Sequence, residues 1–96
     1  MNLRDQYNFE NLTNAAEGLV LDELERQLDE TSKVCKCQDC VLDMAAFALN
    51  QIKPYYRVSL LGRLYADSAQ STAFGGEIKK AVTAAIKKII LNPSHD

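Results

Sequence analysis

The chain has no tryptophan, only one histidine, and no apolar run long enough to span a membrane. Its N-terminus lacks a basic segment followed by an apolar stretch, so we expect no signal peptide. These absences predict a cytoplasmic protein that does not associate with membranes. With 96 residues, of which 47% are hydrophobic, the chain should form a single domain with a small core. We expect this domain to cover the whole chain, 1–96, with its core at roughly 12–91 and tails at 1–11 and 92–96.

Residues that would build a catalytic site are also scarce. The single histidine lies at position 95, and the sequence contains neither a G-x-S-x-G motif nor two separated carboxylates in an apolar setting. A glycine-rich phosphate loop after a strand and an internal repeat are absent as well. We therefore expect that the protein is not an enzyme.

Basic residues do not dominate the chain, which has a net charge of −2. Residues 1–48 carry ten acidic and four basic side chains, whereas residues 49–96 carry three acidic and seven basic ones. The two halves should therefore attract each other, within one chain or across a dimer. A nucleic-acid-binding domain would usually be basic overall, so we expect no nucleic-acid partner.

Apolar residues that recur every three to four positions predict a first helix over residues 14–30. Asn14 is expected to be its N-cap, accepting the backbone N–H of Glu17 in a capping box. Leu21 falls off the apolar stripe, which suggests that another subunit covers this side of the helix. The apolar positions of the stripe are Leu12, Ala16, Leu19, Val20, Leu24 and Leu28.

A second helix is expected from Val41 to Ile52. It should end near Lys53, because Pro54 disfavours the helical conformation in the residue before it and has no N–H to donate. The apolar positions of this helix are Val41, Leu42, Ala45, Ala46, Leu49 and Ile52.

A last helix is expected with Glu77 in its first turn and a stop at Asn92-Pro93. Residues 67–76 are predicted to be a connector and residues 58–65 a loop, and no segment shows the alternation of a strand. The sequence thus predicts an all-α fold, a small three- to four-helix domain. The apolar stripe of the last helix consists of Ile78, Val82, Ala85, Ile86, Ile89 and Ile90.

All three cysteines fall within six residues, just before the second helix. Zinc prefers four tetrahedral thiolate or imidazole ligands, and Cys35, Cys37 and Cys40 would supply three of them from one loop. The sequence therefore predicts a metal loop that holds one zinc ion per chain. The first candidate for the fourth ligand is His95. The alternatives are Asp39, Asp43, a water molecule and a group from a second subunit.

Two other uses of the cysteines compete with structural zinc: thiol redox chemistry or another soft metal, and no specific role. An odd number of clustered cysteines in a reducing cytosol argues against a disulfide framework. Cys37 and Cys40 have the C-x-x-C spacing of thioredoxin-like proteins, but no strand precedes them. We therefore favour structural zinc.

The segment from Cys35 to Tyr56 follows the pattern C-x-C-x-x-C-x-x-D-x-x-A-x-A-L-N-x-I-x-P-x-Y. This pattern resembles the ComFB family, named for a late competence development protein of bacteria, and the resemblance extends over roughly residues 12–60. It implies an all-helical homodimer, with zinc bound by the cysteine-bearing members. It also implies a regulatory or protein-interaction module whose protein partner the sequence does not identify.

Some relatives in this family act as receptors for cyclic di-GMP or cyclic di-AMP, and these share the A-L-N-x-x-x-P-x-Y part but lack the cysteines. The resemblance thus implies an alternative function, cyclic dinucleotide binding. A tyrosine would stack on a purine, arginines would pair with phosphates and a carboxylate would accept from guanine. Helix termination, surface packing and compensation of the helix dipole are ordinary alternatives for the same residues. The candidate ligand-binding residues are Asp43, Asn50, Tyr55, Tyr56, Arg57 and Arg63.

Overall fold

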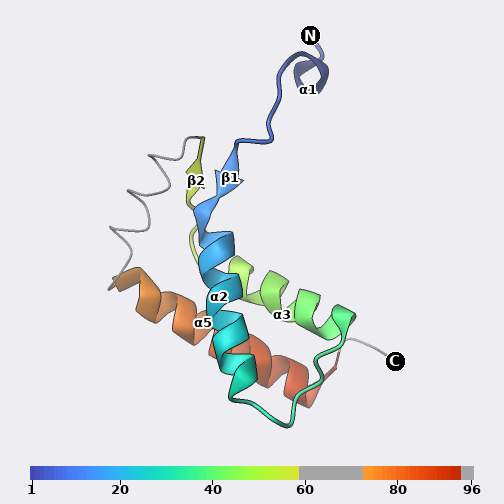
Figure 1. Cartoon of the computed structure of the whole chain (residues 1–96), viewed down its shortest axis with the longest axis vertical. Helices are drawn as coiled ribbons and strands as arrows, with labels where there is room; N and C mark the ends of the chain where they lie inside the picture. Colours follow the sequence, from blue (N-terminus) through green and yellow to red (C-terminus); the bar gives the residue numbers. More distant parts are fainter. Residues whose placement is uncertain (59–72, 94–96) are drawn as a thin grey trace.

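The computed structural model of the chain describes residues 1–58 and 73–93. The described elements are α1 (Leu3–Gln6), β1 (Thr13–Asn14), α2 (Ala15–Asp29), α3 (Gln38–Asn50), β2 (Tyr56–Arg57) and α5 (Ala73–Leu91). The three long helices pack against one another, while the N-terminal segment with α1 extends away from them (Figure 1). The predicted all-α class is confirmed. None of the described helices is long and apolar enough to cross a membrane.

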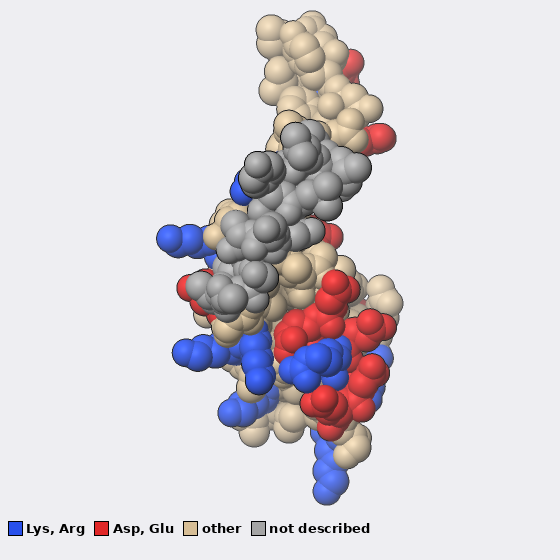
Figure 2. Space-filling view, turned by 60° about the vertical axis from the view of Figure 1, so that its left-hand side comes forward, with Lys and Arg blue, Asp and Glu red and all other residues tan. Residues whose placement is uncertain are grey.

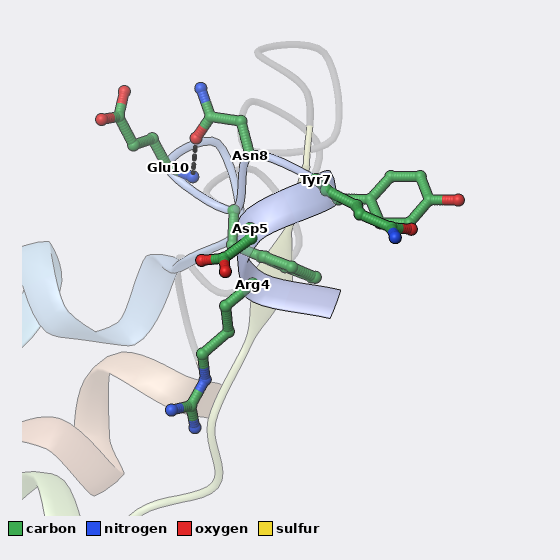
Figure 3. A pocket seen from close by; sticks show the side chains of 7 residues that line it. Arg4, Asp5, Tyr7, Asn8 and Glu10 are labelled. Atoms are coloured by element: carbon green, nitrogen blue, oxygen red, sulfur yellow. Dashed lines mark hydrogen bonds between the residues drawn. The ribbon is translucent and has the colours of Figure 1, made fainter. Parts of the chain in front are cut away.

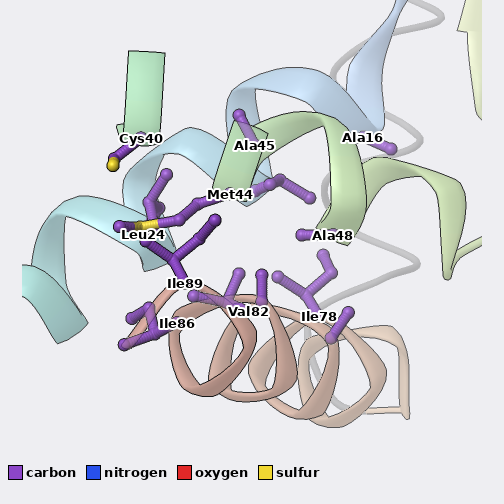
Figure 4. Close-up of a cluster of buried hydrophobic side chains, with 13 residues drawn as sticks. Ala16, Leu24, Cys40, Met44, Ala45, Ala48, Ile78, Val82, Ile86 and Ile89 are labelled. Atoms are coloured by element: carbon purple, nitrogen blue, oxygen red, sulfur yellow. The ribbon is translucent and has the colours of Figure 1, made fainter. Parts of the chain in front are cut away.

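One hydrophobic core holds the three long helices together, and α3 packs on both α2 and α5. Cys40 and Leu24 lie toward Ile89 at one end of this core, and Ala48 lies toward Ile78 at the other (Figure 4). The end of α5 is therefore at the same end of the bundle as the start of α3. The buried core residues are Ala16, Val20, Leu24, Cys40, Met44, Ala45, Ala48, Ile78, Ala81, Val82, Ala85, Ile86 and Ile89.

Helix α2 begins and ends where the sequence predicts, with Asn14 as its N-cap and Glu30 as its C-cap. The details of the cap differ from the prediction, because Asn14 Oδ1 accepts the N–H of Ala16, at 3.1 Å, rather than that of Glu17. Leu12 was expected in the apolar stripe but is exposed, because it precedes β1 and is not part of the helix.

Helix α3 begins at Gln38, three residues before the predicted start. Its buried face includes Met44 and Ala48, which the predicted stripe omitted, while Leu42 and Ala46 of that stripe are exposed. The reason is that α2 and α5 both pack on α3 and also on each other, so α3 buries the single face that follows the spacing of Cys40, Met44 and Ala48.

Helix α5 begins at Ala73, so residues 73–76 are helical rather than part of a connector, and Glu77 lies in the second turn. Residues 59–72, which include most of the predicted loop and connector, lie outside the described residues. On α5, Ala81 is buried although the predicted stripe omitted it, and Ile90 is 45% exposed although the stripe included it. Ile90 directly follows the buried Ile89, so it lies on a different face of the helix, one residue before α5 ends at Leu91.

A short antiparallel ladder joins β1 to β2, pairing Thr13 with Arg57 and Asn14 with Tyr56. Two residues are too few to show the alternation by which strands are predicted, so sequence reasoning missed this pair. The N–H of Ala15 donates to the carbonyl oxygen of Tyr55 at 2.6 Å and extends the ladder into the start of α2. The ladder thus connects the start of α2 to the segment that follows α3.

Acidic side chains gather beside lysine and arginine side chains on one face of the molecule (Figure 2). Arg26 pairs with Glu23 at 2.7 Å and with Glu30 at 3.3 Å, and all three residues belong to α2 or its C-cap. A hydrogen bond links the acidic half of the chain to the basic half, because Gln27 Nε2 on α2 donates to the carbonyl oxygen of Lys79 on α5 at 3.2 Å. Hydrogen bonding from Arg26 lowers the pKa of Glu23, and the charge of Lys79 contributes in the same direction.

Candidate metal centre

The three cysteines meet at the start of α3. Their Sγ atoms all lie within 4.8 Å of one another. Cys35 and Cys37 are half-buried, whereas Cys40 is 0% exposed and belongs to the hydrophobic core. The cluster therefore joins the loop after α2 to the interior of the helical bundle.

Cys37 is the N-cap of α3, with extended backbone angles (φ −73°, ψ 166°). Its Sγ accepts the backbone N–H of Cys40 at 3.4 Å, and its carbonyl oxygen accepts the first helical N–H, from Val41, at 3.0 Å. The N-terminus of a helix carries partial positive charge and stabilises an anionic sulfur. Cys37 therefore has two roles, since it is a candidate metal ligand and also the residue that begins α3.

The cysteine cluster fits a zinc ion. Tetrahedral Zn–S bonds of about 2.3 Å place two sulfurs about 3.8 Å apart, and sulfurs within 4.8 Å reach this spacing by small side-chain rotations. Three sulfurs leave one tetrahedral position for another ligand. Among residues 1–58 and 73–93, the group with metal-ligand spacing contains these three cysteines and neither Asp39 nor Asp43.

The predicted fourth ligand, His95, lies outside the described residues. The chain is described up to Pro93, two residues before it. Ile89, in the last two turns of α5, is buried in the same core as Cys40 and lies at the same end of that core (Figure 4). The C-terminal end of α5 is thus directed to the end of the bundle that holds the cysteines (Figure 1).

The structure brings together only part of the candidate ligand-binding set. The guanidinium of Arg57 lies over the ring of Tyr55, 5.6 Å from its centre, while Tyr56 is 57% exposed. Asn50 lies apart from this contact and lines a hollow together with Lys53 and Lys80.

The two remaining candidate ligand-binding residues are Asp43 and Arg63. Asp43 is half-buried on α3, and Arg63 lies outside the described residues. The hollow that Asn50 lines also includes Glu77 and Ala81 of α5, and neither tyrosine is among its lining residues.

The N-terminal segment forms a separate hollow, lined by residues 4–10 (Figure 3). Every residue that lines it is exposed, and Asn8 Oδ1 accepts the N–H of Glu10 at 2.8 Å. A hollow built only from exposed side chains of one short segment does not resemble a ligand site, which buries most of its ligand.

Sequence reasoning missed two features that shape the metal centre. Cys40 was considered only as a ligand, although the spacing of Cys40, Met44 and Ala48 places it on the packed face of α3. Cys37 was not recognised as an N-cap, because serine, threonine, aspartate and asparagine are the usual residues there.

Comparison with known proteins agrees with this architecture. The family model described as "Late competence development protein ComFB" matches residues 13–93. A solved structure, described as "Structural characterization of the late competence protein ComFB from Bacillus subtilis", matches with a TM-score of 0.76 and 23% sequence identity. The match covers 86% of this chain and 92% of that chain, and it supports the same fold. No curated protein matches the chain.

Proposed function

The chain belongs to the ComFB family of late competence development proteins, and on this basis we propose that it is a competence-related regulatory or protein-interaction module. We further propose that one zinc ion per chain holds its helices in place and that it performs no catalysis. The observation that carries the proposal is the cluster of three cysteine sulfurs at the start of α3.

The proposed role of zinc is structural. When bound, it would cross-link the loop that follows α2 to the first turn of α3. Because Cys40 is also a core residue, this cross-link would be continuous with the packing of α3 on α2 and α5. A small domain without disulfides gains folding free energy from such a metal site.

We assign the fourth ligand to His95. The position of Ile89 beside the cysteine end of the core supports this assignment, since α5 ends two residues later, at Leu91. Replacement of His95 by alanine should then weaken zinc binding by at least tenfold, whereas Asp96→Ala should not. If both variants bind zinc like the wild type, the fourth ligand is another group. Weaker zinc binding by Asp39→Asn or Asp43→Asn would then identify that aspartate as the ligand. Wild-type binding by both would leave a water molecule or a group from a second subunit.

We also propose a homodimer. Leu21 and Leu42, on the outer faces of α2 and α3, are large apolar side chains that remain exposed in one chain, which supports a covering subunit. Sedimentation equilibrium of the purified protein tests the proposal, and a mass of one chain at all concentrations contradicts it.

Metal analysis tests the proposed zinc site directly. Purified protein should contain about one zinc per chain, and removal by a chelator should lower the melting temperature. Cys37→Ser should lose both the metal and the chelator effect, whereas Lys36→Ala, an exposed change in the same loop, should keep both. Protein without metal whose stability is the same in wild type and Cys37→Ser would rule the zinc site out.

Cyclic dinucleotide binding is the alternative function. Its physical support is limited to the contact between Arg57 and Tyr55 and to the exposed ring of Tyr56. These residues offer a cation and an aromatic surface, which are the groups that bind phosphates and purines.

A further inference from the structure

We propose that Cys37 and Cys40 form a dithiol pair that hydrogen peroxide oxidises to a disulfide, and that this disulfide releases the metal. The release of metal rests on the proposed zinc site, whereas the choice of the two cysteines rests on the geometry of α3 alone. The three sulfurs lie within 4.8 Å of one another, so each pair must be weighed.

The Cys37–Cys40 pair spans the first turn of α3, from its N-cap to its third residue. Helix geometry places such α-carbons about 5 Å apart. This separation falls inside the range of about 4.4–6.8 Å that disulfides require. The Sγ of Cys37 already lies 3.4 Å from the backbone nitrogen of Cys40. A disulfide between these two residues therefore needs side-chain rotation and no change of the backbone.

The Cys35–Cys37 pair is less suitable. The two residues flank Lys36 in the segment before α3, so regular helix geometry does not set the separation of their α-carbons. A fully extended Lys36 would place these α-carbons about 7 Å apart, at or beyond the upper limit for a disulfide. Cys35 and Cys40 lie on either side of the N-cap residue, so the helical turn that brings Cys37 and Cys40 together does not fix their separation.

The exposure of the two residues assigns their chemical roles. Cys40 is 0% exposed, whereas Cys37 is half-buried, so peroxide reaches Cys37 first. The Cys37 thiolate attacks one peroxide oxygen, the O–O bond breaks and hydroxide leaves, which gives a sulfenic acid. The Cys40 thiolate then attacks the Cys37 sulfur, the S–O bond breaks and hydroxide leaves. Cys37 and Cys40 together lose two electrons to the peroxide.

The disulfide changes the metal centre because it withdraws two of its three sulfurs. The remaining ligands, Cys35 and the proposed His95, are only two of the four that zinc prefers and do not suffice to retain it. The change also reaches the core, since Cys40 packs in the cluster that contains Leu24, Met44 and Ile89. A dithiol reductant breaks the bond and restores zinc binding, which makes the pair a reversible switch between a zinc-bound and a disulfide form.

The sequence around the cluster allows the pairing to be mapped without ambiguity. Trypsin cleaves after Lys36 and separates Cys35 from Cys37, while a protease that cleaves before aspartate separates Cys37 from Cys40 at Asp39. Zinc-loaded full-length protein is treated with peroxide, remaining thiols are alkylated, and both proteases are applied. We expect a cross-linked peptide pair that contains Cys37 and Cys40, with alkylated Cys35. Released zinc, followed with a chromogenic chelator, should reach one equivalent per chain and should rebind after reduction.

Two variants separate the roles of the cysteines. Cys35→Ser keeps the pair and should still form the disulfide, whereas Cys40→Ser should instead accumulate a Cys37 sulfenic acid that dimedone traps. A cross-link that includes Cys35, or zinc that stays bound under peroxide, overturns the inference. If the purified protein contains no zinc, the proposed metal site fails, and the peptide map of the same protein still decides whether Cys37 and Cys40 pair.

Discussion

The side-chain oxygen of Asn14 accepts the backbone N–H of Tyr55 at 2.8 Å, although 41 positions separate the two residues in the sequence. The same oxygen caps α2 by accepting the N–H of Ala16 at 3.1 Å. One side chain therefore fixes both the start of α2 and the path of the chain after α3.

Replacement of Asn14 by alanine should lower the free energy of unfolding by about 2 kcal/mol, because it removes the helix cap and leaves the partly buried N–H of Tyr55 without its acceptor. Asn14→Asp is the matched control, since it keeps an acceptor oxygen and a favourable charge at the helix start. Urea denaturation measures both. Equal stability of Asn14→Ala and the wild type would contradict the dual role of this oxygen.

A pair of substitutions on α3 tests its assigned orientation. Met44→Ala should cost about 2–5 kcal/mol, because Met44 is fully buried and its removal leaves a cavity. Leu42→Ala, on the outer face where the side chain is 57% exposed, should change stability by less than about 0.5 kcal/mol in a monomer. A larger loss for Leu42→Ala that grows with protein concentration would indicate that a second subunit covers this residue.

The ion pair of Glu23 with Arg26 predicts a small dependence of stability on pH. The hydrogen bond from Arg26 holds the pKa of Glu23 below its usual 4.5, so the pair stabilises the fold above about pH 4.5. This contribution is lost as the pH falls through the lowered pKa. It should be small, because the side chain of Arg26 is 48% exposed and solvent screens the pair.

Denaturation of Glu23→Gln at a series of pH values measures this contribution. The variant should be less stable than the wild type at neutral pH, and the difference should vanish in acid. Glu25→Gln, an exposed change on the same helix, serves as the control and should show no such pattern. A difference that persists below the lowered pKa would assign the effect to packing instead.

Calorimetric titration with cyclic di-GMP and cyclic di-AMP separates the proposed function from its alternative. The zinc-stabilised interaction module predicts no heat of binding for either compound at tens of micromolar. A cyclic dinucleotide receptor predicts saturable binding that Arg57→Ala abolishes, because this change removes the cation over the Tyr55 ring. Lys53→Ala, on the hollow that includes Asn50, provides a comparison with loss of a neighbouring cation.

The long helices could be predicted because their signals are local. The bounds of α2 follow from Asn14 and from the spacing of Ala16, Val20 and Leu24, all within one element. The face that α3 buries depends on where α2 and α5 pack on it, and the sequence of α3 alone does not distinguish the exposed Leu42 from the buried Met44. The β1–β2 ladder depends wholly on a contact between distant segments.

The metal centre could be predicted as a set of residues but not as a structure. Three cysteines within six positions suffice to indicate that they bind one metal ion together, and their sulfurs do lie within 4.8 Å of one another. The sequence does not reveal that Cys37 caps α3, because that role depends on where the helix begins. The spacing of Cys40, Met44 and Ala48 indicates a packed face, but the sequence of α3 does not reveal that residues of other helices, such as Leu24 and Ile89, complete the core around it.

The ladder and the cysteine cluster lie at opposite ends of α3, and this separation provides an internal reference for hydrogen exchange. The amide protons of Ala15 and Tyr55 are both donated across the ladder, so they exchange only when β1 leaves β2 or the whole domain opens. The amide proton of Cys40, donated to Cys37, reports on the other end. Removal of metal that frays only the start of α3 would accelerate exchange at Cys40 alone, whereas global destabilisation would accelerate all three amides together.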